Sequence, residues 1–180
     1  MEIKVREVQE RDRDTIVSII TRIDNLIDEE RRCAVELMDI YLKDRKQEDY
    51  HLLCVVDEGD RPLGYLCYGK ASLTDAVYDL YWIAVDPLCQ GKGIGRVLMG
   101  HLEEVLKDAK ARLVIVETSS QPSYDRTRLF YERMGFHEVA RLRDFYKVED
   151  DKVIYIKQLT TDSRPKTQDR RLKLGNSNEE

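Results

Sequence analysis

The residues best suited to chemistry form a short glycine-rich segment at residues 90–96. The segment follows an apolar run that ends at residues 83–85 and precedes apolar residues at helical spacing. The first turn of a helix leaves backbone N–H groups without partners, and the helix dipole attracts anions to them. Glycine also lets the backbone approach phosphate oxygens and adopt positive φ. The segment therefore predicts a diphosphate-binding loop, which consists of Gln90, Gly91, Lys92, Gly93, Ile94, Gly95 and Arg96.

The glycine spacing excludes two common nucleotide-binding loops. A Walker loop needs Ser or Thr after Gly-Lys, but Gly93 follows Lys92 here. A dinucleotide fingerprint needs Gly-x-Gly-x-x-Gly, and its third glycine falls on Arg96 or on Leu98, depending on where the pattern starts. The spacing that remains is Gln-x-x-Gly-x-Gly, beginning at Gln90.

The apolar periodicity of the chain indicates which elements position this loop. Strands are expected at residues 3–7, 52–56, 62–68, 76–85, 113–117, 136–142 and 153–159. Helices are expected at residues 14–23, 29–43, 94–109 and 125–134. In the last helix Asp125 is the expected N-cap, and Gly135 occupies the position that favours a left-handed stop. This order describes an α/β sandwich with a central mixed sheet flanked by helices.

Length and charge limit the class of protein. The chain has 180 residues, with 30 Lys and Arg against 35 Asp and Glu and a formal net charge of −5. We expect one domain over residues 1–160 and, because residues 161–180 are almost entirely polar, a disordered C-terminal tail. The acidic balance argues against nucleic-acid binding, and the apolar runs are too short to cross a membrane. The N-terminus lacks a signal pattern, so a cytoplasmic protein is expected.

The cysteines and histidines indicate neither a metal site nor a disulfide framework. No two of the four cysteines form a Cys-x-x-Cys pair, and the three histidines are scattered without ligand spacing. We therefore expect no bound metal and interpret the cysteines as small buried thiols: Cys33, Cys54, Cys67 and Cys89.

Two separated motifs resemble those of the GNAT superfamily of N-acetyltransferases. The superfamily carries Gln/Arg-x-x-Gly-x-Gly/Ala at a strand-to-helix junction, which Gln90, Gly93 and Gly95 match. Residues 129–136 (Leu-Phe-Tyr-Glu-Arg-Met-Gly-Phe) are similar to the superfamily's Leu-Tyr-Glu-x-x-Gly-Phe element. Together with the order of elements, the resemblance covers residues 2–159. It implies a GNAT-like acyl-CoA N-acyltransferase fold with acetyl-CoA as the acyl-donor cosubstrate.

The resemblance also implies how acetyl-CoA binds. Its pyrophosphate lies on the backbone N–H groups of residues 90–96. Its pantetheine arm pairs with the strand edge formed by Ile83, Ala84 and Val85, where family members splay two parallel strands apart. A backbone N–H near Val85 then polarises the thioester oxygen. Family members often carry Asn seven residues before the motif tyrosine, and Tyr124 stands at that pantetheine-contacting position here.

Acetyl transfer needs a neutral amine, whereas a lysine-like amine titrates near pH ~10.4, so a base or a water chain must remove a proton. Glu117 ends an apolar strand and resembles the glutamate that some family members use as the base. Asp79 in the preceding strand is the competing candidate, and Glu117 could instead cap its strand or pair with Arg126 or Arg128. Tyr131 matches the tyrosine that protonates the departing CoA thiolate, the alternative being a tyrosine that only fills the core.

The function that follows is transfer of an acetyl group from acetyl-CoA to a primary amine by direct attack in a ternary complex. The alternative is a GNAT-fold module that binds acyl-CoA without turnover, as a sensor or interaction partner. The acceptor is expected to be a small-molecule or peptide amine, bound by the first two helices and by loops near residues 72–74 and 143–146. A homodimer is left open. An acidic cluster suits a cationic acceptor, although a solvated helix start explains it equally: Asp24, Asp28, Glu29 and Glu30.

Overall fold

Seven strands form one continuous mixed sheet in this computed structural model, which describes residues 2–159. The strands are β1 (Lys4–Glu7), β2 (His51–Val56), β3 (Pro62–Lys70), β4 (Val77–Val85), β5 (Leu113–Ser119), β6 (His137–Lys147) and β7 (Asp150–Gln158). Their order across the sheet is β1-β2-β3-β4-β5-β7-β6. Every neighbouring pair is antiparallel except β4 and β5, which run parallel. The expected α/β fold with a central mixed sheet is confirmed, and the expected tail at residues 161–180 lies outside the described residues.

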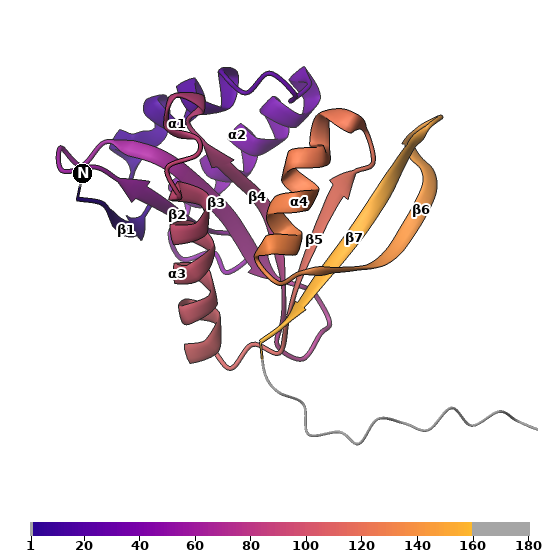
Figure 1. The fold of residues 1–180 in the computed structure, drawn as a ribbon. Coiled ribbons are helices and arrows are strands. Elements are labelled where there is room, and N and C mark those ends of the chain that lie inside the picture. Colours follow the sequence, from indigo (N-terminus) through magenta and orange to yellow (C-terminus); the bar gives the residue numbers. More distant parts are fainter. Residues whose placement is uncertain (1, 160–180) are drawn as a thin grey trace, which may run out of the picture.

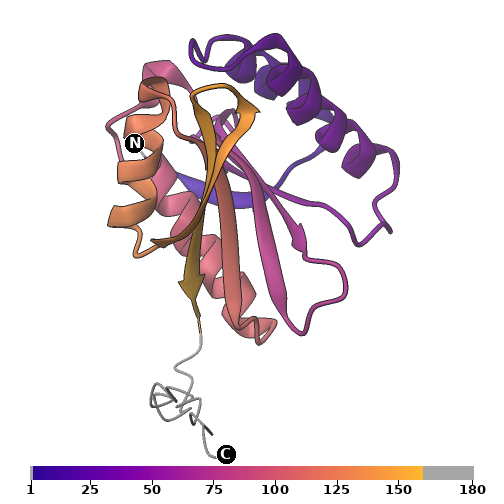
Figure 2. The same ribbon diagram turned by 90° about the vertical axis from the view of Figure 1, so that its right-hand side faces the viewer.

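Four α-helices cover the two faces of the sheet (Figure 1). They are α1 (Arg13–Thr21), α2 (Asp28–Lys43), α3 (Ile94–Asp108) and α4 (Asp125–Arg133). Figure 2 shows α1 and α2 on one side of the sheet and α3 and α4 on the other. Three short 3₁₀ helices connect elements: η1 (Glu10–Asp12), η2 (Pro87–Cys89) and η3 (Pro122–Tyr124). No helix within residues 2–159 is long and apolar enough to cross a membrane.

Two hydrophobic cores follow from this layering. The residues of α3 that recur at helical spacing, Ile94, Leu98, Leu102 and Leu106, are buried against one face of the sheet. On the other face, Ile16, Ile19 and Ile20 of α1 pack with Met38 of α2 over β2 and β3. The strands buried between the cores are fixed from both sides, so the site that they carry rests on a rigid support.

The parallel strands β4 and β5 pair only along their first halves. Their register runs from Val77 opposite Leu113 to Leu80 opposite Val116, and it ends there. Beyond that point β5 stays with β7 and β4 stays with β3. The edge of β4 from residue 81 to residue 85 therefore faces a gap in the sheet, as expected for the splayed strands of the GNAT fold.

A bulge on β4 lies where the two strands part. Cys67 of β3 pairs with Trp82 and the next residue pairs with Leu80, so Tyr81 is the extra residue. Past the bulge, the N–H of Asp86 donates to the carbonyl of Leu63 on β3. Because N–H directions alternate along an antiparallel strand, Ile83 and Val85 turn their N–H groups toward the gap.

Three local expectations were wrong. Residues 143–146 belong to β6 rather than to a loop, because a bulge with positive φ at Asp144 allows the strand to continue to Lys147. β5 continues to Ser119, since that residue still pairs with Lys152 of β7. Asp125 does not cap α4, because η3 leads directly into the helix and leaves Asp125 in its first turn.

Candidate functional site

A cavity of about 820 Å³ opens on the α1–α2 side of the sheet, where β4 and β5 separate. Its walls come from the connection between α1 and α2, from β4 and β5, and from η3 and α4. The β6–β7 hairpin contributes Tyr146, Lys147 and Asp150. The loop at residues 72–74, expected to help form the acceptor pocket, does not line this cavity, whereas both first helices do.

The glycine-rich loop has the backbone that the sequence predicts. Gly91 has φ of 75° and Gly93 has φ of 83°, both in the left-handed region that glycine adopts most easily. A Cβ at either position would meet nothing within 4 Å, so open space lies over both residues. Gly95 differs, because a Cβ there would lie 3.3 Å from the ring of Phe130 on α4. Two glycines thus shape the loop, and the third allows α3 to approach α4.

The loop presents free hydrogen-bond donors. Among residues 2–159, no acceptor is found for the backbone N–H of any residue from 90 to 96. The first intrahelical bond of α3 runs from the N–H of Val97 to the carbonyl of Gly93. Lys92 and Arg96 form no ion pair within the described residues, so both cations remain available to an anion. Free N–H donors at a helix start, with two cations beside them, are the features that a phosphate-binding loop requires.

A half-buried ion pair lies at the start of this loop. Nη2 of Arg22, just after α1, donates to Oδ2 of Asp86 at 2.8 Å. The other carboxylate oxygen of Asp86 accepts from the N–H of Leu88 at 3.1 Å and caps η2. Asp86 is buried, whereas the Arg22 side chain is 35% exposed. The ion pair therefore couples the end of α1 to the entrance of the loop.

Glu117 and Asp79 both line the cavity, from neighbouring strands. Oε2 of Glu117 lies 2.6 Å from Nζ of Lys152 on β7, and the Glu117 side chain is 46% exposed. Glu117 thus pairs with Lys152 rather than with Arg126 or Arg128. Asp79 sits opposite Ile115 in the β4–β5 register, and burial, together with the charge of Glu117, raises the pKa of its carboxyl. The two candidate bases are electrostatically coupled.

Tyr131 lies on α4, buried between the core and the cavity. Its ring packs at 5.8 Å from Phe136 and 6.3 Å from Tyr155, measured between centroids. Its hydroxyl makes no hydrogen bond within residues 2–159, and burial raises its pKa well above the ordinary value. The side chain therefore fills the core and also faces the cavity, so the two interpretations of Tyr131 are compatible.

Tyr124 connects the two sides of the cavity. Its hydroxyl donates to Oε1 of Glu30 at 2.7 Å and also lies 3.3 Å from the carbonyl of Asn25. The other oxygen of Glu30 accepts from the N–H of Ile27 at 2.8 Å, which fixes the start of α2. Burial and the hydrogen bond to Glu30 raise the pKa of Tyr124. The Tyr124 hydroxyl thus contacts the α1–α2 connection.

Sequence reasoning missed several residues of this cavity. Tyr65 and Trp82 line it, and Lys152 holds Glu117, whereas Tyr146 belongs to the segment 143–146 that was expected at the acceptor pocket. The alternation of side chains along β4 could have predicted that Trp82 faces the cavity. The bulge at Tyr81 interrupts this alternation, so the sequence pattern does not show it. Cys33 also lines the cavity and is exposed, which contradicts its interpretation as a buried thiol. Cys54 and Cys67 are buried, and Cys89 is half-buried.

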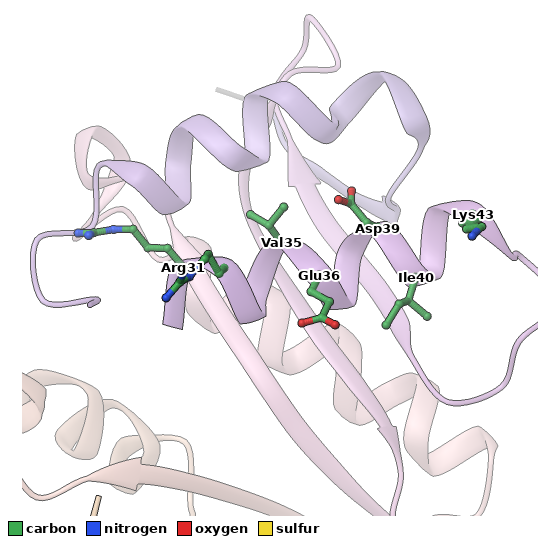
Figure 3. A pocket seen from close by; sticks show the side chains of 7 residues that line it. Arg31, Val35, Glu36, Asp39, Ile40 and Lys43 are labelled. Carbon is green, nitrogen blue, oxygen red and sulfur yellow. The ribbon is translucent and has the colours of Figure 1, made fainter. Parts of the chain in front are cut away.

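A second hollow lies on the outer face of α2 (Figure 3). Its lining side chains all come from that single helix, including Arg31, Glu36 and Asp39. Within the described residues no other element contributes a side chain to its lining, although Arg13 of α1 donates to Asp39 from the side. Within residues 2–159, no group of three His, Cys, Asp or Glu side chains is placed to hold a metal ion. The cavity at the β4–β5 gap is therefore the candidate active site.

Comparison with known proteins shows the family of the chain. Residues 20–136 match the acetyltransferase (GNAT) family model. The chain is 37% identical over 71 residues to the N-alpha-acetyltransferase RimI of Mycobacterium tuberculosis, a match that covers 39% of this chain and 42% of that protein. It is 31% identical over 106 residues to the ribosomal protein bS18-alanine N-acetyltransferase of Haemophilus influenzae, covering 58% of this chain and 67% of that protein.

A solved structure extends the likeness over the whole fold. The crystal structure of a protein assigned to the GNAT family of acetyltransferases, from Desulfovibrio desulfuricans, superposes with a TM-score of 0.84 at 35% identity. The superposition covers 88% of this chain and all of that one. The chain therefore belongs to the acetyltransferase (GNAT) family.

Proposed function

We propose that this protein transfers the acetyl group of acetyl-CoA to a primary amine by direct attack in a ternary complex. The main observation behind this proposal is that the unpaired edge of β4 joins the loop at residues 90–96, with its free N–H donors, to the cavity at the β4–β5 gap. A diphosphate fits the loop, because Gly91 and Gly93 leave open the space that side chains would occupy. The two sides of the sheet then serve donor and acceptor separately.

Acetyl-CoA binds along this edge. Its pyrophosphate accepts hydrogen bonds from the N–H groups of residues 90–96, with Lys92 and Arg96 beside it. Its pantetheine arm lies along Ile83, Ala84 and Val85 as an added strand. The N–H groups of Ile83 and Val85 face the gap, so either can polarise the thioester oxygen. The ring of Tyr124 borders the arm while its hydroxyl stays on Glu30.

Glu117 takes the proton from the acceptor ammonium, and Lys152 holds its carboxylate in place. Asp79 is the competing base, because it lines the same cavity and because burial and the charge of Glu117 raise its pKa, which favours uptake of a proton. Tyr131 donates its phenolic proton to the departing thiolate. The raised pKa of Tyr131 keeps its hydroxyl protonated until that thiolate forms beside it.

The acceptor is a small-molecule or peptide amine that enters from the α1–α2 side. The names of the two relatives, an N-alpha-acetyltransferase and a ribosomal protein bS18-alanine N-acetyltransferase, support a peptide. The acidic side chains of the cavity support any cationic amine. The proposal places the reaction in the cytoplasm, since the four cysteines of the described chain are all free thiols.

The competing function is acyl-CoA binding without turnover, favoured by the close pairing of Glu117 with Lys152. CoA release, followed with a thiol reagent over a panel of amines and short peptides, separates the two functions. Amine-dependent release supports acetyl transfer. Tight acetyl-CoA binding in calorimetry, without release on any acceptor, supports the binding module.

A further inference from the structure

The α1–α2 connection, residues 22–27, forms one wall of the cavity and has an irregular backbone. Four of its side chains line the cavity: Ile23, Asn25, Leu26 and Ile27. The N–H groups of Ile23 and Leu26 donate to carbonyls three residues earlier, at 3.2 and 3.4 Å. Among residues 2–159, no acceptor is found for the N–H of Asp24 or Asn25. A segment with so few backbone hydrogen bonds opens at a low free energy unless side-chain contacts hold it.

Arg22 ties the beginning of this connection to the turn before the glycine-rich loop. Its guanidinium donates through Nη2 to Asp86 at 2.8 Å and through Nη1 to the Ser18 hydroxyl at 2.6 Å. Asp86 is 3% exposed, and its backbone carbonyl accepts from the N–H of Cys89 at 2.7 Å. Because Gln90 follows directly, the residue that holds Arg22 also shapes the turn from which the loop begins.

Tyr124 ties the end of the connection to η3, on the other side of the cavity. Its hydroxyl donates to Glu30 at 2.7 Å and lies 3.3 Å from the carbonyl of Asn25. The second carboxylate oxygen of Glu30 accepts from the N–H of Ile27 at 2.8 Å. Within the described part of the chain, Asp86 and Tyr124 are the only residues outside α1 and α2 that hydrogen-bond to residues 22–30.

Both contacts lead to groups that lie beside acetyl-CoA in the proposed function. The N–H donors of residues 90–96 have no acceptors within residues 2–159, so a diphosphate that binds them restricts the loop and the turn at Asp86. The pantetheine arm restricts the ring of Tyr124 in the same way. A contact with a partner that is already ordered costs less entropy, so both contacts hold the connection more strongly when CoA is bound.

We infer that Arg22 and Tyr124 are positioning residues that couple the two halves of the site: bound CoA stabilises the α1–α2 connection, which then binds the amine more tightly. This inference rests on the proposed function. The guanidinium of Arg22 acts through Asp86, and the hydroxyl of Tyr124 acts through Glu30 and Asn25. Coupling between two ligands is reciprocal, so the amine also raises the affinity for CoA.

Amide hydrogen exchange tests the coupling without an acceptor. The full chain is measured by mass spectrometry with and without saturating CoA. CoA should slow exchange at residues 90–96, because its diphosphate occupies their N–H groups. In the wild-type chain it should also slow exchange at residues 22–27 at least about fivefold.

Two variants remove one contact each. Arg22→Met removes the ion pair and keeps an unbranched apolar stem, whereas Tyr124→Phe removes the hydroxyl and keeps the ring. Each should reduce the protection of residues 22–27 by CoA to less than about twofold and leave residues 90–96 protected. Arg13→Met is the matched control, because Arg13 begins the same helix and pairs with Asp39 of α2 at a similar exposed fraction. Its protection by CoA should equal that of the wild-type chain.

A purely structural role predicts a different result. Loss of a merely structural contact speeds exchange at residues 22–27 equally with and without CoA, so the ratio between the two states is unchanged. That result in both Arg22→Met and Tyr124→Phe overturns the inference. Protection of residues 90–96 without protection of residues 22–27 in the wild-type chain also overturns it.

Kinetics separates failure of the inference from failure of the proposed function. With the amine of the panel that releases CoA fastest, Arg22→Met and Tyr124→Phe should raise KM for the amine about fivefold and change kcat less. Loss of the CoA-dependent protection in both variants, without CoA release on any amine, supports the coupling and contradicts acetyl transfer. Release of CoA by a wild-type chain whose residues 22–27 gain no protection contradicts the coupling and leaves acetyl transfer intact.

Discussion

Nζ of Lys152 on β7 lies 2.6 Å from Oε2 of Glu117 on β5, at the wall of the cavity. The ammonium also stands 3.9 Å from the ring centroid of Phe145, so two neighbours hold it. Lys152→Met should lower kcat/KM for acetyl transfer about tenfold, because the proposed base loses the group that orients it. Lys157→Met is the matched control, since Lys157 lies on the same strand but pairs with Glu103 outside the cavity. Equal losses in both variants would argue that Lys152 serves stability alone.

Glu117 and Asp79 are the two candidate bases, and replacing each carboxylate with its amide tests which of them takes the proton. Glu117→Gln should lower kcat about a hundredfold or more, whereas Asp79→Asn should lower it by a smaller factor. Glu117→Gln should also lower the pKa of Asp79, because the Glu117 charge is one cause of its raised value, so any part of the acidic limb that Asp79 sets should move to lower pH. Steady-state kinetics across pH with a saturating amine measures both effects. A larger loss in Asp79→Asn would identify Asp79 as the base.

Tyr131→Phe tests the general acid. Removal of the hydroxyl should lower kcat about a hundredfold and leave the melting temperature nearly unchanged, because the ring contacts with Phe136 and Tyr155 remain. Tyr68→Phe is the control, since Tyr68 is buried in the same core but does not line the cavity. Full turnover by Tyr131→Phe would leave Tyr131 with a packing role only.

Gly93→Ala tests the diphosphate loop. An alanine adopts φ of 83° at the start of α3 only at a cost of roughly 1–2 kcal/mol, so the free loop of the variant should relax to another backbone. Binding of CoA must then restore the strained backbone, which should raise the Kd for CoA about tenfold. Gly100→Ala, in the middle of the same helix, meets no atom within 4 Å and should leave the affinity unchanged. Calorimetric titration with CoA gives both values, and wild-type affinity in Gly93→Ala would contradict the loop assignment.

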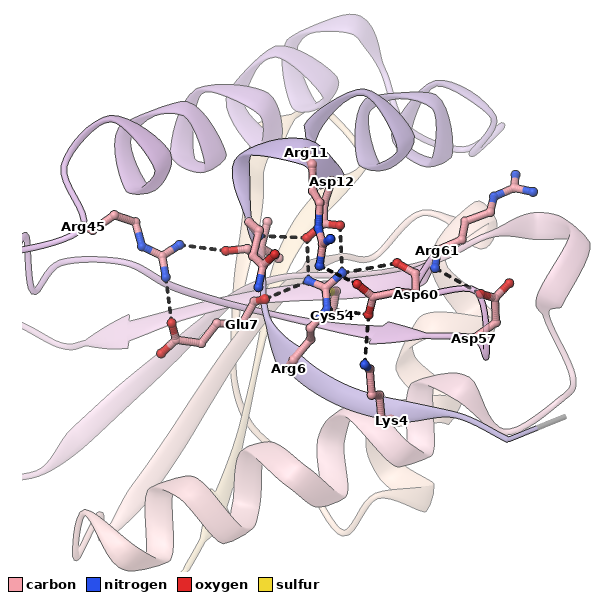
Figure 4. A network of polar contacts seen from close by, with 12 residues as sticks. Lys4, Arg6, Glu7, Arg11, Asp12, Arg45, Cys54, Asp57, Asp60 and Arg61 are labelled. Atoms are coloured by element: carbon pink, nitrogen blue, oxygen red, sulfur yellow. Dashed lines mark hydrogen bonds and ion pairs between the residues drawn. The ribbon is translucent and has the colours of Figure 1, made fainter.

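The ion network at the β1 edge of the sheet makes a stability prediction (Figure 4). Arg6 donates to both carboxylate oxygens of Asp12, at 2.6 and 2.9 Å, and to Asp60 at 3.0 Å. Asp12 is 2% exposed, so Asp12→Asn should lower the free energy of unfolding by about 3 kcal/mol in urea denaturation. Asp14→Asn, whose side chain is 98% exposed, should change it by less than about 0.5 kcal/mol.

The same network sets the response to acid. Burial alone would raise the pKa of Asp12, but hydrogen bonds from Arg6 and from the N–H of Gln9 outweigh it and hold the pKa below its ordinary value. Hydrogen bonds from Arg6 and Lys4 lower the pKa of Asp60 to about 2. Carboxylates with lowered pKa values stabilise the fold above their unfolded value of 3.8 and lose that contribution as the pH falls toward 2. A midpoint of urea unfolding that did not fall between pH 4 and pH 2 would contradict this account.

Local sequence patterns predict the helices, the strands and the glycine-rich loop of this fold. Helical spacing of apolar residues predicts α3, and the glycines at 91 and 93 have the positive φ expected of them. Gly135 likewise has φ of 85° at the end of α4. These features depend on neighbours within a few residues, so the local sequence is enough to predict them.

Local sequence patterns do not predict which side chains pair across the cavity. Tyr124 meets Glu30 across 94 residues, and Glu117 meets Lys152 only because β7 inserts between β5 and β6. The Tyr65 hydroxyl, which has no hydrogen-bond partner within residues 2–159, is buried only because α1 and α2 cover β3. The extension of β6 through residues 143–146 depends on a bulge that apolar alternation does not encode.

Product stoichiometry tests the central claim most directly. The full chain is incubated with acetyl-CoA and each amine of the panel, and the CoA released is compared with the N-acetylated amine measured by mass spectrometry. Acetyl transfer in a ternary complex predicts equal amounts of CoA and N-acetyl product for at least one amine, and no release without an amine. Release of CoA with free acetate in place of an N-acetyl product, or no release on any amine, would contradict the account.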